Sequence, residues 1–193
     1  MSKKGYRTMS ELPDHDILYP LSMFRMARQI PALNYEILEG NEMPQPYREL
    51  LVHDGDMTSR LEQFHDGAIY VDRLHASSDG KAYFREVVLR SKSDDSVVEY
   101  GAIEINLAAL PEEMKEEVLA ARLPLGGILN HHRISSSSSP KAFLQIVPDA
   151  AIRETFGQVE QTLYGRCNQI IGFSGETYAH IVEILPPTAS SAD

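Results

Sequence analysis

Two charged side chains lie at strand positions where the alternation of residues predicts burial. In YAHIVEIL, residues 178–185, successive side chains point to opposite faces of a sheet, and Glu183 falls on an otherwise apolar face. In AYFREVVLR, residues 82–90, the same alternation puts Arg85 on an apolar face and Glu86 on a mixed outer face. A buried charge is costly unless it is paired or neutral. Arg85 and Glu183 therefore each require a partner or a function.

Two arrangements of Arg85 and Glu183 meet this requirement. In the first, they form a structural ion pair with each other. In the second, they lie apart and hold opposite ends of a small anionic ligand, because a planar guanidinium binds a carboxylate through two parallel hydrogen bonds. Arg166, near the start of the predicted strand 163–173, is either a second cation for the ligand or an exposed strand-end side chain. Periodicity does not choose between these alternatives.

The segment PLGGIL, residues 124–129, is another candidate for ligand contact, and we predict a turn there. Its two glycines either let backbone amides beside Leu125 approach a bound carboxylate or only permit the bend. Asp56 is placed to cap the N-terminus of a helix, which Met57 then begins with its side chain on the buried side.

The histidines do not form a recognisable metal site. His53 and His65 share no helix or strand face, and the acids around them suit the start of a capped helix. His131 and His132 are adjacent, so their side chains are expected to diverge. We therefore expect no metal.

The elements that must position these residues follow from local patterns. Alternating segments separated by polar turns predict a three-stranded antiparallel meander and, later, a hairpin. On the third strand, Ile103, Ile105 and Leu107 are expected to face the core and Tyr100 to face outward. The five predicted strands are 68–74, 82–90, 97–107, 163–173 and 178–186. A helix is predicted over 111–123, and the polar, serine-rich segment 130–143 is predicted to be a flexible lid.

Size, charge and cysteine content limit the class of protein. A chain of 193 residues with 42% hydrophobic content suits one domain over 1–193, with flexible ends at 1–16 and 187–193. A formal charge of −10 argues against nucleic acid as a partner. A lone Cys167 suits a reducing compartment, and neither a signal peptide nor an apolar stretch of membrane-spanning length is present. We expect a cytoplasmic protein without a membrane partner.

Seven short segments share their order and spacing with one known family. They are IPAL (30–33), DMTSRLEQF (56–64), FREVVL (84–89), PLG (124–126), GR (165–166), SGE (174–176) and VEILP (182–186). Together they resemble the chorismate pyruvate-lyase family, which forms 4-hydroxybenzoate, and its chorismate lyase-like relatives. Three parts of the chain depart from the family pattern: the acidic HDG (53–55) before DMT, Cys167 and Asn168 after Arg166, and the flap segment 131–140.

The resemblance implies a fold and a site. The fold would be α+β, with a curved antiparallel sheet of about six strands and helical flaps over an internal ligand pocket. Arg85 and the backbone amide of Leu125 would hold the ligand carboxylate. Glu183 would bond the ring hydroxyl, and Met57 would line the pocket.

The resemblance also implies a reaction. A monomeric lyase without a cofactor would convert chorismate to 4-hydroxybenzoate and pyruvate, driven by aromatisation of the ring. Arg85 would anchor the substrate, and Glu183 would take part in proton transfer. Two alternatives share the fold: a sensor-type protein that binds an aromatic or cyclohexadienyl carboxylate without turnover, and a lyase or isomerase acting on another ring acid. Regulators that use this fold carry an attached DNA-binding domain, and we expect none in this chain.

Overall fold

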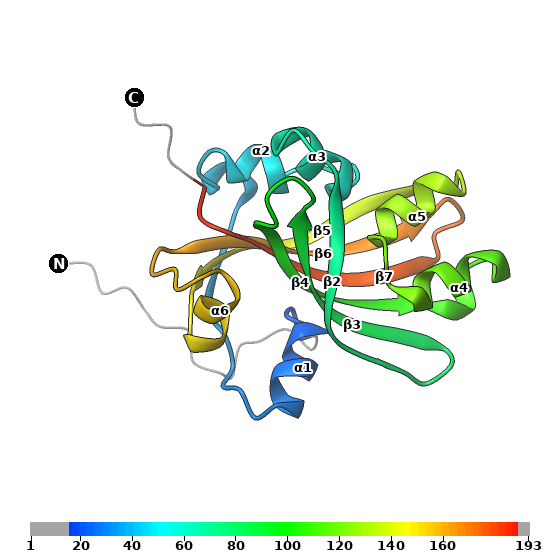
Figure 1. The fold of residues 1–193 in the computed structure, drawn as a ribbon, viewed down its shortest axis with the longest axis horizontal. Helices are drawn as coiled ribbons and strands as arrows, with labels where there is room; N and C mark the ends of the chain where they lie inside the picture. Colours follow the sequence, from blue (N-terminus) through cyan, green and yellow to red (C-terminus); the bar gives the residue numbers. More distant parts are fainter. Residues whose placement is uncertain (1–15, 189–193) are drawn as a thin grey trace.

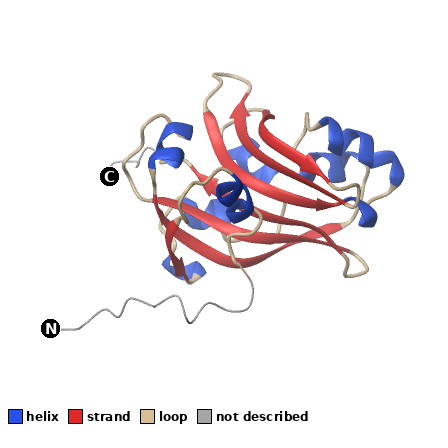
Figure 2. Ribbon diagram, turned by 90° about the horizontal axis from the view of Figure 1, so that it is seen from below, coloured by secondary structure: helices blue, strands red, loops and turns tan. Residues whose placement is uncertain are grey.

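One antiparallel sheet of seven strands organises residues 16–188, the part of the chain that the computed structural model describes (Figure 1). The strands lie in the order β1-β5-β6-β7-β4-β3-β2, and the sheet curves strongly (Figure 2). They are β1 (Asn34–Leu38), β2 (Ile69–Ser78), β3 (Ala82–Ser91), β4 (Val97–Asn106), β5 (Ser136–Val147), β6 (Leu163–Gly172) and β7 (Thr177–Leu185). The predicted α+β fold with a curved antiparallel sheet is confirmed, with seven strands in place of about six.

The predicted flexible ends, 1–16 and 187–193, lie outside the described residues except for Asp16, Pro187 and Thr188. Nothing in the structure therefore tests that prediction for the remaining residues of the two ends.

Two strands, β1 and β5, are not identified by the sequence patterns. The β5 strand begins inside segment 130–143, and the prediction of a flexible lid there is wrong. Its serines, Ser136–Ser139, pair with residues 169–172 of β6. A run of identical small polar side chains shows no alternation of polar and apolar residues, so the pattern does not predict a strand. Backbone hydrogen bonds to the neighbouring strand hold the run in place.

Six α-helices and two short 3-10 helices connect the described strands. They are α1 (Leu21–Ala27), η2 (Gly40–Glu42), α2 (Tyr47–Leu51), α3 (Met57–Phe64), η3 (Leu107–Ala109), α4 (Glu112–Ala120), α5 (Leu125–His131) and α6 (Ala150–Thr155). The predicted helix over 111–123 corresponds to α4. The predicted turn over 124–129 is instead the start of α5, because Leu125, Ile128 and Leu129 are buried together on one helical face despite the two glycines.

The two faces of the sheet are covered by different helices. In Figure 1, α2 and α3 lie at the top and α4 and α5 at the right, whereas α1 and α6 lie at the bottom. The first four helices pack on the face that carries Tyr83 and Val87 of β3. Helices α1 and α6 pack on the opposite face, against Val88, Tyr100 and Val182. Both faces of β7 therefore carry buried side chains.

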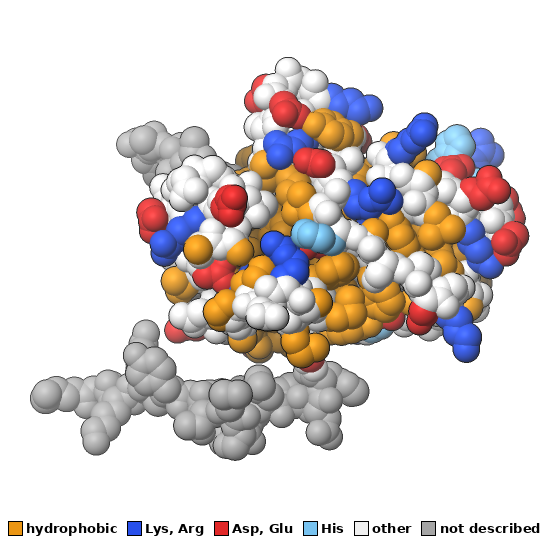
Figure 3. Space-filling view, turned by 60° about the horizontal axis from the view of Figure 1, so that its bottom comes forward, with side chains coloured by type: hydrophobic (Ala, Val, Ile, Leu, Met, Phe, Trp, Pro, Cys, Tyr) orange, Lys and Arg blue, Asp and Glu red, His pale blue; other side chains and the backbone are white. Residues whose placement is uncertain are grey.

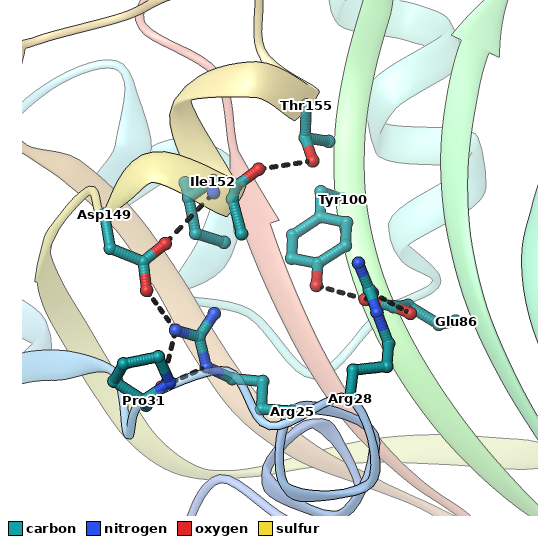
Figure 4. A network of polar contacts seen from close by, with 9 residues as sticks. Arg25, Arg28, Pro31, Glu86, Tyr100, Asp149, Ile152 and Thr155 are labelled. Atoms are coloured by element: carbon teal, nitrogen blue, oxygen red, sulfur yellow. Dashed lines mark hydrogen bonds and ion pairs between the residues drawn. The ribbon is translucent and has the colours of Figure 1, made fainter.

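A polar network anchors α1 on the second face (Figure 4). Arg28 of α1's C-terminus donates to both carboxylate oxygens of Glu86, at 3.0 and 2.9 Å, and the Tyr100 hydroxyl donates to Oε1 at 2.6 Å. Arg25 donates to the carbonyl of Pro31 and pairs with Asp149, which caps α6. Glu86 and Tyr100 were predicted to face outward, and both are buried. A mixed pattern on a strand does not show that a helix from elsewhere in the chain will cover it.

The outer surface mixes charge types. On the face shown in Figure 3, acidic and basic side chains are scattered among hydrophobic ones. Among the described helices, none combines the length and the apolar character that crossing a membrane requires.

Candidate ligand-binding site

A cavity of about 230 Å³ lies on the face of the sheet that carries α3 and α5. Strands β3, β4, β6 and β7 contribute residues to its lining, as do the two helices and the serines at 135–138. All five predicted site residues line it: Met57, Arg85, Leu125, Arg166 and Glu183. The structure thus brings together residues from five separate elements, while their roles in binding stay predictions.

Arg85 enters the cavity as a buried cation. It is 2% exposed, and the one side-chain hydrogen bond that it makes to a described residue runs from Nη2 to the carbonyl oxygen of Leu123 at 3.3 Å. Within residues 16–188, Nε and Nη1 have no partner. Burial lowers the pKa of Arg85 to about 10, so the guanidinium stays charged at neutral pH. Arg85 does not pair with Glu183, which excludes the first of the two predicted arrangements.

Glu183 has a different partner, Arg166. The two residues face each other across the β6–β7 pair, and Arg166 Nε donates to Glu183 Oε2. Arg166 is completely buried, so the alternative of an exposed strand-end side chain is wrong. Its Nη1 also donates to the carbonyls of Leu51 at 3.0 Å and His53 at 3.2 Å. Nε and Nη1 of Arg166 thus hold two groups in place: the Glu183 carboxylate and the loop that follows α2.

Glu99 of β4 is a site residue that the sequence analysis missed. Its side chain is 6% exposed and lines the cavity, and Oε2 has no hydrogen-bond partner in the described part of the chain. Burial, and then repulsion by Glu183, raise the pKa of Glu99 well above its usual value. The strand pattern could have identified it. Glu99 lies an even number of residues from Ile103 and Ile105 on the same strand, so it points to the core face to which they were assigned.

Asp56 joins the two helices that border the cavity. As predicted, it caps α3, accepting from the amides of Thr58 at 3.3 Å and Ser59 at 3.0 Å. It also accepts from Asn130 Nδ2 of α5 at 3.2 Å. Gly126 makes this approach possible, because a Cβ atom there would lie 2.0 Å from Asp56 Oδ1.

We predict that Gly126→Ala destabilises the protein relative to Gly127→Ala. The alanine at 126 forces Asp56 away from its bonds to α3 and α5, and the loss of a helix cap costs about 1 kcal/mol or more. A Cβ atom at Gly127 meets nothing within 4 Å, so alanine there gains up to about 1 kcal/mol from helix propensity. Urea denaturation of both variants measures the difference, and equal free energies of unfolding would show that Asp56 does not hold the two helices together.

Outside the cavity, one group within residues 16–188 has side chains placed as metal ligands. Ligand atoms of Glu117, His131 and His132 lie within 4.8 Å of one another. The two histidine rings were expected to diverge, but they meet edge to face with centroids 5.2 Å apart. A hydrogen bond of 2.9 Å between His132 Nε2 and Glu117 Oε1 joins α4 to α5 and accounts for the arrangement.

Comparison with known proteins gives matches only among solved structures. No family model and no curated protein matches the chain. The effector domain of PhnF from Mycobacterium smegmatis matches with a TM-score of 0.52 at 10% identity, covering 68% of this chain and 88% of that one. A structure of PhnF itself matches with a TM-score of 0.51 at 11% identity, covering 86% and 93%. At these identities the likeness shows the fold alone, and this chain has the chorismate lyase-like α+β fold that it shares with the PhnF effector domain.

Proposed function

We propose that this protein binds a small ring carboxylate in the cavity and acts as a sensor-type ligand-binding module. One observation carries the proposal: Arg85 is a buried cation at the cavity wall, and two of its guanidinium nitrogens have no partner among residues 16–188. Burying an unpaired charge costs free energy that an anionic ligand would recover through charge-assisted hydrogen bonds. The fold supports the same proposal, since in PhnF it forms an effector domain.

The charge balance of the cavity favours one negative charge on the ligand. Glu183 and Arg166 neutralise each other, and Glu99 favours its neutral form because of burial. Two further acids line the cavity, but Asp54 is exposed to solvent and Asp56 is engaged as the cap of α3. Arg85 is then the buried cavity charge without a counter-charge among the described residues. A volume of about 230 Å³ and apolar walls that include Val87, Leu129 and Ile181 suit a monocyclic acid.

A chorismate lyase is the second candidate. Met57, Arg85, Leu125 and Glu183, the four residues to which the family resemblance assigns substrate contacts, all line this one cavity. In the reaction, the ring loses a proton and its C–O bond to the enolpyruvyl group, the ring becomes aromatic, and the released enolpyruvate takes up a proton to give pyruvate. Arg85 would fix the ring carboxylate in place for this elimination. Because Glu183 is held by Arg166, it would act as an ionised acceptor rather than as a free acid.

Two assays on the purified chain test the proposal and separate the candidates. Calorimetric titration with 4-hydroxybenzoate measures binding, and incubation with chorismate coupled to lactate dehydrogenase measures pyruvate release. We expect binding at micromolar or lower dissociation constants, without pyruvate. Pyruvate formed together with 4-hydroxybenzoate would instead identify a lyase. If neither binding nor turnover occurs with these two compounds or with benzoate, the proposal of a ring-carboxylate site is wrong.

A further inference from the structure

We infer that Glu99 is a ligand-contacting residue that donates a hydrogen bond from its carboxyl group to an oxygen atom at the end of the ligand remote from Arg85. The inference rests on the proposed binding function and narrows its ligand class. The ligand is then a ring monocarboxylate that carries a hydroxyl, ether or carbonyl oxygen opposite the carboxylate.

The sheet register places Arg85 and Glu99 at separate positions on one face. Arg85 of β3 lies opposite Ile103 of β4, and Leu89 lies opposite Glu99. Ile103 and Glu99 are four positions apart along β4, which corresponds to about 13 Å of extended strand between their backbones. Both charged side chains line the same cavity. A ring with a polar group at each end can therefore extend from one to the other.

Gly101 lets the Glu99 carboxyl reach along the sheet toward Arg85. It lies two residues from Glu99 on β4, opposite Val87 of β3 on one side and Glu183 of β7 on the other, and it lines the cavity. A Cβ atom at this position would lie 2.6 Å from the carbonyl oxygen of Val182, so no larger residue fits without a shift of the strands. The same Cβ position lies 3.6 Å from Glu99 Oε1, so the Glu99 carboxyl reaches over Gly101, on the side of its own strand position that is nearer to Arg85.

The surrounding groups favour a neutral Glu99. Burial and the charge of Glu183 raise the pKa of Glu99, as does Asp56 at the N-terminus of α3, while Arg166 of β6 opposes them. Arg166 is already paired with Glu183, so Glu99 has no cation of its own. The other charged residues that line the cavity are Asp54 and Arg85. A neutral carboxyl can donate a hydrogen bond, whereas the ionised Glu183 can only accept one.

Proton linkage follows from this assignment. A bound carboxylate adds negative charge to the cavity and disfavours ionisation of Glu99 further, so binding and protonation of Glu99 favour each other. Ligand affinity should fall as the pH rises through the pKa of Glu99, by up to about tenfold per pH unit. The stability of the unliganded protein should fall in the same direction, because a raised pKa stabilises the fold only while the group keeps its proton.

The test compares Glu99→Gln, Glu99→Leu and the control Glu104→Gln on the other face of β4. Titrations with 4-hydroxybenzoate and benzoate, in buffers of different ionisation enthalpy between about pH 5.5 and about pH 8, give affinities and proton uptake. We expect the wild type and the control to prefer 4-hydroxybenzoate about tenfold. We also expect them to take up protons on binding at the pH values at which Glu99 of the unliganded protein has lost its proton. Glu99→Gln should keep the preference without proton uptake, because its amide still donates. Glu99→Leu should lose the preference.

Three outcomes would decide against the inference or its basis. If the wild type takes up protons on binding and Glu99→Gln takes up the same number, or if Glu99→Leu keeps the preference for 4-hydroxybenzoate, Glu99 is not the donor. If 4-(aminomethyl)benzoate binds more tightly than 4-hydroxybenzoate and Glu99→Gln abolishes that gain, Glu99 acts as an anion and the ligand class is wrong. If the wild type binds none of these acids, the proposed function itself fails. Urea denaturation of each variant shows whether it is folded.

Discussion

Replacing Arg85 by methionine is expected to weaken the binding of a ring carboxylate by at least about a hundredfold without loss of stability. Hydrogen bonds to a charged group contribute about 1.5–3 kcal/mol each, and the two free nitrogens of Arg85 can make two of them. In the unliganded protein, Arg85 makes one hydrogen bond and no ion pair with a described residue. An apolar side chain of similar length removes the cost of burying that charge. The variant should therefore be at least as stable as the wild type.

Arg90→Met is the matched control for this experiment. Arg90 lies on the same strand but has 27% of its side chain exposed and pairs with Asp72, with 3.0 Å between Nε and Oδ2. Its replacement should change neither ligand affinity nor stability by a large amount. Calorimetric titration and urea denaturation measure the two quantities for both variants. An Arg85→Met protein that binds the ligand like the wild type, or that unfolds readily while Arg90→Met does not, would show that Arg85 is a structural residue.

Glu183→Gln is expected to reduce the free energy of unfolding by about 3–5 kcal/mol, because it leaves the buried Arg166 without a counter-charge. Arg166→Met should cost a similar amount, since it leaves Glu183 unpaired and removes the bonds to the carbonyls of Leu51 and His53. The double variant should be markedly more stable than the sum of the two losses predicts, because it leaves neither charge unpaired.

A double-mutant cycle of urea denaturation curves measures this coupling. Additive losses would show that the ion pair does not couple the two strands. A Glu183→Gln protein of wild-type stability that no longer binds the ligand would instead assign Glu183 directly to the ligand. The distinction matters for any lyase assay, because loss of activity in a Glu183 variant is otherwise explained equally well by loss of the fold.

Local patterns in the sequence identify a large part of this molecule. Strand alternation predicts the burial of Arg85 and Glu183 because the side-chain period of a strand depends only on the backbone. The cap at Asp56 and the helix α4 are also predicted from local sequence, because a few consecutive residues define the start of a helix. The meander of β2, β3 and β4 and the hairpin of β6 and β7 are joined by short polar turns that the sequence shows directly.

What the sequence does not specify locally is which residues meet. The partner of Glu183 is Arg166 and not Arg85 because β6 lies beside β7, whereas β4 separates β7 from β3. Glu86 is buried because α1 covers a face whose composition alone suits solvent. Strand order and helix placement depend on contacts between distant segments, which no local period encodes. The sequence thus predicted the burial of Arg85 and Glu183. The tertiary structure decided that Glu86, Glu99 and Arg166 are buried as well, and which of these charges are paired.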